Sequence, residues 1–181
     1  MERIRPSLHY WTYIEHAQCL KFAADENVRL FYKYAPIFNS EDDRKRSLGF
    51  YSSSMLLFAL CLENILKARA LFIEKENIEN GIIKTFNDFL KKWNKGSHGH
   101  GLNEIIEFYN IDMTPEEKEI IAELEPYTIW NGRFLYPRDE NLTRIFESGK
   151  GNWGTLTLNY IDQIDKLILR QINEMKIKNA L

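Results

Sequence analysis

The residues best suited to chemistry in this chain are Glu63 and Lys67, which lie four positions apart in an apolar stretch. Four residues are about one helical turn, so both side chains share a face, with the acid on the N-terminal side as an ion pair prefers. The helix predicted over residues 52–76 is apolar on nearly all sides, which is typical of a buried helix. Because an unpaired buried charge is strongly unfavourable, we expect both groups to find partners elsewhere in the chain.

Two residues outside this helix are the best candidates for those partners. His100, in the glycine-rich stretch 95–101, can donate to a carboxylate or accept from an ammonium group, and Arg133 can bind a carboxylate through two hydrogen bonds. In one interpretation the four residues form a satisfied polar network that pins loops to the helix. In the other, Lys67, Arg133 and backbone amides of the glycine-rich loop bind a phosphate or a nucleotide.

An aromatic and basic segment follows the predicted helix that begins near Pro115. It contains Trp130, Arg133, Phe134, Tyr136 and Arg138. Such residues can stack on bases and contact phosphates, or they can simply close the core while a tyrosine hydroxyl stays hydrated. Trp130 and Arg138 are therefore candidates for base or phosphate contacts.

A metal site is the weaker alternative for the glycine-rich loop. His98 and His100, with Glu63 or Glu104, would supply three ligands, but a His-x-His pair in such a loop is a weak signal. The chain contains no P-loop, dinucleotide fingerprint, His-Glu-x-x-His or Gly-x-Ser-x-Gly motif. We expect neither a metal nor a cofactor.

Composition and charge set limits on the class of protein. The formal net charge of -2 argues against a surface that is basic throughout, although it permits a local basic groove. Met1 to Pro6 begin no secretory signal, and the longest apolar run, residues 55–62, is too short to span a bilayer. Cys19 and Cys61 lie in apolar helical patterns, so we expect free, buried thiols, a cytoplasmic location and no membrane partner.

Helical periodicity recurs along the chain, and no stretch alternates convincingly with the period of a strand. Thr114-Pro115-Glu116-Glu117 is a strong helix start, with a capping residue, a proline at the first helical position and acids in the first turn. The fold predicted is all-α, a bundle of about four to five main helices plus short helices. Helices are expected over residues 9–34, 52–76, 82–93, 102–109, from 115 towards 130, and from 155 onwards. Residues 39–43 offer a capping residue and acids suited to a helix N-terminus, and residues 44–46 lead from there into the second of these helices.

A single domain is expected from the length of 181 residues. Its parts are residues 1–46, an N-terminal helix and connector; 47–137, a core that bears the motifs; 138–154, a loop region; and 155–181, a closing C-terminal helix.

Four segments occur in an informative order. They are ALCLENILKARAL (59–71), HGHGLNEI (98–105), a helix opened by Pro-Glu-Glu, and WNGRFLYP (130–137). Together they resemble the HEPN superfamily of helical domains, in particular families with an E-x-x-L-K-A helix, then H-D-L or similar, then an R-Y-P-like element. The matching residues are Glu63, Lys67, His100, Arg133, Tyr136 and Pro137.

The resemblance implies a helical bundle, often a homodimer, that acts with a nucleotide, an RNA or a partner protein in bacterial toxin–antitoxin or phage-defence systems. This chain departs from the pattern at two places. His100 is followed by Gly-Leu instead of Asp-Leu, and Phe134-Leu135 separate Arg133 from Tyr136. Tyr136-Pro137 is therefore the firmer half of the last motif.

The ribonucleases of the superfamily carry an arginine followed about four to six residues later by a histidine that would act at the scissile phosphate. Arg133, the arginine of the matching segments, is followed by Phe-Leu-Tyr-Pro-Arg-Asp-Glu and has no histidine at that spacing. We therefore expect a non-catalytic binding or interaction module. Two alternatives remain: a purely structural adaptor, and an RNase or nucleotide-processing enzyme in which His100 and Arg133 meet only in three dimensions.

Overall fold

The computed structural model describes residues 5–35, 40–131, 140–148 and 156–177. Within these ranges every regular element is a helix, which confirms the predicted all-α fold. In chain order the elements are the short 3-10 helix η1 (Pro6–Leu8), α1 (Tyr10–Tyr34), α2 (Glu41–Ile73), α3 (Lys75–Glu79), α4 (Phe86–Trp93), α5 (Leu102–Tyr109), α6 (Pro115–Pro126), the π-helical η2 (Tyr127–Asn131), α7 (Glu140–Glu147) and α8 (Leu158–Ile177).

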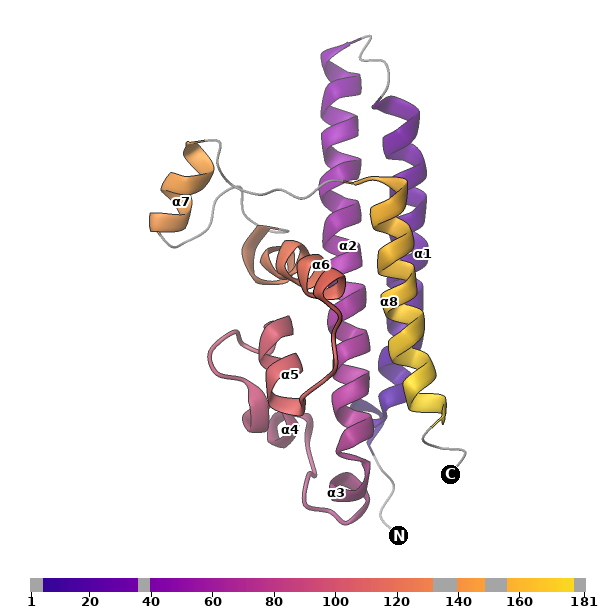
Figure 1. Ribbon diagram of the computed structural model, residues 1–181, viewed down its shortest axis with the longest axis vertical. Helices are drawn as coiled ribbons and strands as arrows, with labels where there is room; N and C mark the ends of the chain where they lie inside the picture. Colours follow the sequence, from indigo (N-terminus) through magenta and orange to yellow (C-terminus); the bar gives the residue numbers. More distant parts are fainter. Residues whose placement is uncertain (1–4, 36–39, 132–139, 149–155, 178–181) are drawn as a thin grey trace.

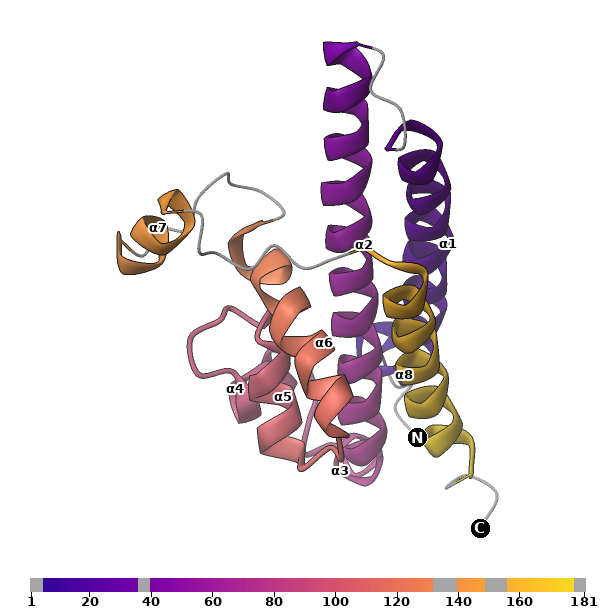
Figure 2. The same ribbon diagram turned by 45° about the horizontal axis from the view of Figure 1, so that its top comes forward.

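The long helix α2 is the axis of the molecule (Figure 1). Helix α1 runs antiparallel to it, and α8 lies beside both, so the three long helices form one layer (Figures 1 and 2). Helices α4, α5 and α6 pack against α2 from the other side, while α7 stands apart from the bundle in both views. Elements from both sides therefore enclose the C-terminal half of α2.

The start of α2 shows why this helix is longer than its apolar stretch. Ser40 caps the helix by accepting from the backbone N–H of Asp43 at 3.1 Å, and three acids occupy the first turn, where they complement the helix dipole. The helix thus begins at Glu41, where the capping residue and acids of residues 39–43 predicted a helix N-terminus, and it continues through the predicted boundary between residues 46 and 47. The N-cap and the acids of the first turn therefore let α2 extend beyond its buried C-terminal half.

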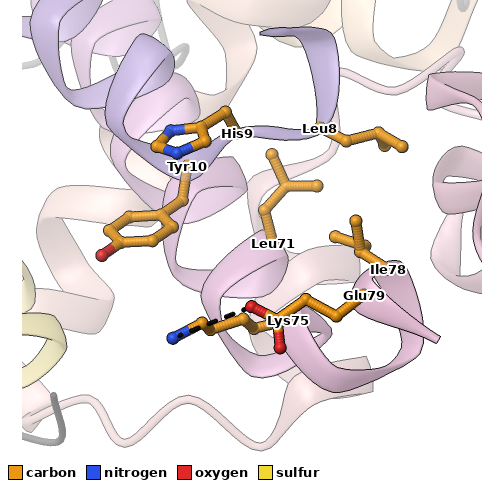
Figure 3. Close-up of a pocket in the computed structure, with 7 residues that line it drawn as sticks. All are labelled: Leu8, His9, Tyr10, Leu71, Lys75, Ile78 and Glu79. Carbon is orange, nitrogen blue, oxygen red and sulfur yellow. Dashed lines mark ion pairs between the residues drawn. The ribbon is translucent and has the colours of Figure 1, made fainter. Parts of the chain in front are cut away.

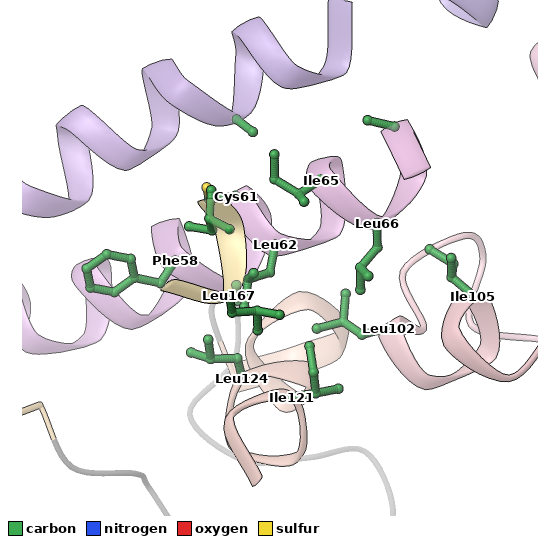
Figure 4. Close-up of a cluster of buried hydrophobic side chains, with 14 of the residues drawn as sticks. Phe58, Cys61, Leu62, Ile65, Leu66, Leu102, Ile105, Ile121, Leu124 and Leu167 are labelled. Atoms are coloured by element: carbon green, nitrogen blue, oxygen red, sulfur yellow. The ribbon is translucent and has the colours of Figure 1, made fainter. Parts of the chain in front are cut away.

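Burial on α2 is concentrated in its C-terminal half, as its all-round apolar pattern predicts. There its side chains interdigitate with those of α5, α6 and α8 to form the core (Figure 4). The labelled members are Phe58, Cys61, Leu62, Ile65 and Leu66 of α2, Leu102 and Ile105 of α5, Ile121 and Leu124 of α6, and Leu167 of α8. A charged residue on this part of α2 is therefore inside the protein.

Capping residues define the shorter helices. Thr85 and Asp88 form a capping box at α4, so that helix begins at Phe86 and the predicted start at residue 82 was four residues too early. Thr114 and Glu117 form a second capping box at α6, with Pro115 at the first position, as the sequence predicted. After Pro126 the chain continues as the π-helical turn η2.

Two other expectations were wrong. Residues 138–154 are not all loop, because Glu140–Glu147 form α7, in which Glu140 and Arg144 pair across one turn. Cys61 is buried as predicted, but Cys19 is exposed, because it lies on the outer face of α1.

Among the described helices, none combines the length and the apolar character that crossing a membrane requires.

Candidate functional site

Glu63 and Lys67 form the buried ion pair that their spacing predicted. The ammonium nitrogen of Lys67 lies 2.6 Å from Oε1 of Glu63, and the two side chains are only 10% and 6% exposed. The ammonium of Lys67 also lies over the ring of Phe86, 6.0 Å from its centroid, where a cation–π contact is favourable. Both charges are thus neutralised inside the fold.

His100 is the second partner of Glu63. Its Nδ1 lies 3.1 Å from Oε2 and 3.3 Å from Oε1 of the same carboxylate, so one buried acid holds a lysine of its own helix and a histidine of the glycine-rich loop. The His100 side chain is 34% exposed, far more than its two partners. The cluster is therefore sealed at Glu63 and Lys67 and reaches solvent at His100.

The glycine-rich loop is fixed by acceptors from its own flanks. Oδ1 of Asn94 accepts from the N–H groups of Gly96 at 3.3 Å and Gly99 at 3.2 Å. Oε2 of Glu104 accepts from the N–H of Lys95 at 3.1 Å and the hydroxyl of Ser97 at 2.7 Å. Three backbone amides that could have cradled a phosphate are therefore occupied, and Glu104 is engaged as an acceptor.

The peptide group of His100 is also tied down. The hydroxyl of Thr128, a fully buried residue of η2, lies 2.8 Å from the carbonyl oxygen of His100 and equally close to that of Glu125. The N–H of His100 donates to the carbonyl of Ser97 at 3.1 Å. The histidine is thus held through its ring by α2 and through its backbone by η2.

The remaining predicted site residues are not described. Arg133, Tyr136 and Arg138 lie outside the described residues, and only the backbone of Trp130 is described. The structure therefore brings together three of the four residues of the predicted network and leaves the contribution of Arg133 as a prediction.

In the described part of the chain, no three or more His, Cys, Asp or Glu side chains are placed to hold a metal ion.

A second buried ionic cluster was missed from the sequence. Arg69, two turns from Glu63 on α2, pairs with Glu174 of α8, and Arg170 binds both Glu174 at 3.0 Å and Glu117 of α6 at 2.8 Å. Arg170 also donates to the carbonyl of Asp112 at 2.8 Å. One signal was available: Arg69 is a charge within the same apolar helix as Glu63, and the same argument required a partner for it.

A small cavity lies where the start of α1 meets the end of α2 and α3 (Figure 3). Its volume is about 50 Å³, and Leu8, Leu71 and Ile78 supply most of its apolar wall. Lys75 and Glu79, which pair at 4.0 Å, lie at its edge. The cavity shares no lining residue with the cluster at His100, so it is not part of that site.

Comparisons of the chain with protein-family models, with curated proteins and with solved structures find no match.

Proposed function

We propose that this protein is a non-catalytic, HEPN-like binding module that engages a phosphate group of a nucleotide or an RNA at His100. The observation that carries the proposal is the way one buried carboxylate holds the partly exposed imidazole. Glu63 occupies Nδ1 of His100, while Nε2 has no hydrogen-bond partner among the described residues. The ring is therefore oriented from inside the fold and has one nitrogen left for a ligand.

The chemistry of that nitrogen suits a phosphate. When the imidazole carries both protons, Nδ1 donates to Glu63 and Nε2 can donate to a phosphate oxygen. Because Lys67 already neutralises Glu63, protonated His100 would bring a net positive charge to the surface. Arg133 and Tyr136, which the resemblance places beside His100, are proposed to complete the contact.

Binding without catalysis is the function proposed because the nuclease pattern is missing from the segments that resemble the superfamily. No histidine follows Arg133 at the spacing of the superfamily's ribonucleases, and His9, which follows Arg3 by six residues and Arg5 by four, lies outside those segments. Lys67, the other cation of the cluster, is held by Glu63 at 2.6 Å and is not free to stabilise developing charge on a substrate. The homodimer, the partner protein and the bacterial toxin–antitoxin or phage-defence context implied by the resemblance belong to the same proposal.

The test is a binding titration with a matched pair of histidine variants. Fluorescently labelled RNA and labelled ATP are titrated with the wild-type protein, His100→Asn and His98→Asn, and anisotropy is followed. We expect His100→Asn to weaken binding about tenfold, since a charge-assisted hydrogen bond contributes about 1.5 kcal/mol. His98, exposed in the same loop, is the control and should bind like the wild type.

A structural adaptor is the second candidate, and the loop supports it. Asn94 and Glu104 accept hydrogen bonds from the backbone N–H groups of the glycine-rich loop, so these groups need no ligand. In an adaptor, the cluster of Glu63, Lys67 and His100 would have the single role of fixing this loop against α2. Wild-type protein that binds neither RNA nor ATP at tens of micromolar would favour the adaptor over the binding module. His100-dependent cleavage of the labelled RNA in the same samples would instead favour an enzyme.

A further inference from the structure

The corner where α6 passes into η2 holds the main chain at residues 100–103. The hydroxyl oxygen of Thr128 lies 2.8 Å from the carbonyl oxygen of His100. The carboxylate of Glu125 accepts from the backbone N–H of Asn103 at 2.8 Å and from its side-chain amide at 2.7 Å. Helix α5 has no side-chain cap of its own at Gly101, so Glu125 supplies an acceptor for its first turn.

Gly101 lies between these two contacts and fixes the path of the chain. The residue is buried, and a Cβ atom at this position would lie 2.9 Å from Oγ of Ser97 and 3.0 Å from the side chain of Glu104. The main chain therefore runs against the glycine-rich loop with no side chain between them. Close contacts on one side and hydrogen bonds on the other define where the carbonyl of His100 lies.

The hydroxyl of Thr128 connects His100 to η2. It has one proton and lies 2.8 Å from two carbonyl oxygens, those of His100 and Glu125, so the proton is shared in a three-centre hydrogen bond. The bond to Glu125, three residues earlier, is local, whereas the bond to His100 joins two elements separated by 28 residues. Because Thr128 is fully buried, it can act on a ligand only through another residue.

The ring and the main chain of His100 are thus held by different elements. Glu63 of α2 lies 3.1 Å from Nδ1, and this contact alone would let the residue pivot about one ring atom. A second contact at the carbonyl removes that freedom, so the direction of Nε2 is set by two fixed points. A group that is already oriented loses less conformational entropy when it binds a ligand.

We propose that Thr128 is a positioning residue for the ligand contact of His100. Its hydroxyl holds the main chain of His100 while Glu63 holds the ring, so Nε2 is oriented before a phosphate arrives. This inference rests on the function proposed for His100. Since Arg133 follows Thr128 by five residues, the same hydroxyl also ties His100 to the segment that carries the second proposed phosphate contact.

The test begins with the anisotropy titration of labelled RNA. Thr128→Val replaces the hydroxyl by a methyl group of similar size, and it should weaken binding about fivefold, the net effect of one hydrogen bond. Thr128→Ser keeps the hydroxyl and should bind like the wild type. The matched control is Thr12→Val, an exposed change on α1 that should leave binding unaltered.

A double-mutant cycle separates positioning from a general loosening of the fold. If Thr128 acts through the ring of His100, Thr128→Val should have no further effect on binding in a protein that already carries His100→Asn. The same fivefold loss in both backgrounds would overturn the proposal, because it would show that Thr128 acts on the ligand site by another route.

A second measurement needs no ligand. In ¹⁵N NMR spectra of the free protein, the ring signals of His100 should move towards those of the exposed His16 in Thr128→Val and keep their wild-type positions in Thr128→Ser. Unchanged ring signals in Thr128→Val would overturn the role of Thr128, whatever the binding result. Wild-type protein that binds neither RNA nor ATP would instead overturn the function proposed for His100, and the ring signals would still decide whether Thr128 positions it.

Discussion

Helix α2 contributes residues to two ionic clusters that lie within two helical turns of each other, and the two clusters are built in different ways. The first joins Glu63 to Lys67 of the same helix and to His100 of the loop that precedes α5. The second joins Arg69 to α8 and α6 through pairs separated by 105 and 53 residues in sequence. The first therefore fixes a loop on a helix, whereas the second fixes the positions of three helices relative to one another.

The difference also concerns how completely the charges are satisfied. The carboxylate of Glu63 lies within hydrogen-bond distance of both Lys67 and His100, and none of its side-chain atoms is a buried atom without a partner. In the second cluster, Nε and Nη1 of Arg69 have no partner among the described residues, and neither has the amide of Gln171 on α8. Within one helix turn, the spacing of the residues alone brings donor and acceptor together. In a cluster from three helices, every hydrogen bond depends on the relative positions of three backbones, so some donors are left without an acceptor.

The largest effect is expected from removing the shared acid of the first cluster. Glu63→Leu leaves the ammonium of Lys67 buried without a carboxylate, so the free energy of unfolding should fall by about 3 to 5 kcal/mol. Urea denaturation followed by circular dichroism measures this change. Glu107→Gln, whose side chain is 70% exposed, should change the stability by less than about 0.5 kcal/mol.

A double variant sharpens this prediction. Glu63→Leu combined with Lys67→Met removes both buried charges, and the stability should recover to within about 1 to 2 kcal/mol of the wild type. A double variant no more stable than Glu63→Leu alone would contradict the view that the unpaired ammonium causes the loss.

A smaller effect is expected in the second cluster. Arg170→Met removes the link between Glu117 and Glu174, but Glu117 keeps its bond to the N–H of Thr114 and Glu174 keeps Arg69. With Arg170 29% exposed, we expect a loss of about 2 kcal/mol in urea denaturation. Lys166→Met, on an exposed pair of the same helix, is the control. A loss equal to that of Glu63→Leu would show that the two clusters are equally important.

The smallest effect concerns acid sensitivity at Glu74, outside both clusters. Burial opposes its ionisation, but hydrogen bonds from Lys92 at 2.5 Å and Asn77 at 2.6 Å outweigh it and lower the pKa of Glu74. A carboxylate with a lowered pKa in the folded state stabilises the fold above its ordinary pKa of 4.5, and this contribution disappears as the pH falls below the folded value.

Glu74→Gln should therefore be less stable than the wild type near pH 7 by about 1 kcal/mol, and the difference should shrink as the pH falls towards 3. Thermal denaturation at a series of pH values measures this difference. Lys84→Gln, an exposed change near α4, should leave the pH profile unaltered. A difference that is constant with pH would rule out the ionised form of Glu74 as its source.

Local signals account for the parts of the fold that the sequence predicted well. The capping box at Thr114 and the apolar positions of residues 102–109 lie within a few residues of the structure they determine, and both helices were predicted with correct starts. The start of α2 was marked by its capping residue and acids, since its exposed first turns carry no apolar pattern. Helix α7 was missed because it is a short helix apart from the core. Periodicity detects buried faces better than it detects helices.

The sequence by itself determined the all-α class, the buried character of α2 and the pairing of Glu63 with Lys67, because each depends on spacing within one helix. Only the tertiary structure decided that Arg69 meets Glu174, that Glu104 closes the glycine-rich loop on itself, and that Thr128 contacts the carbonyl of His100. Such contacts join residues from separate elements, and a periodic pattern shows which face of a helix is buried without showing what lies against it.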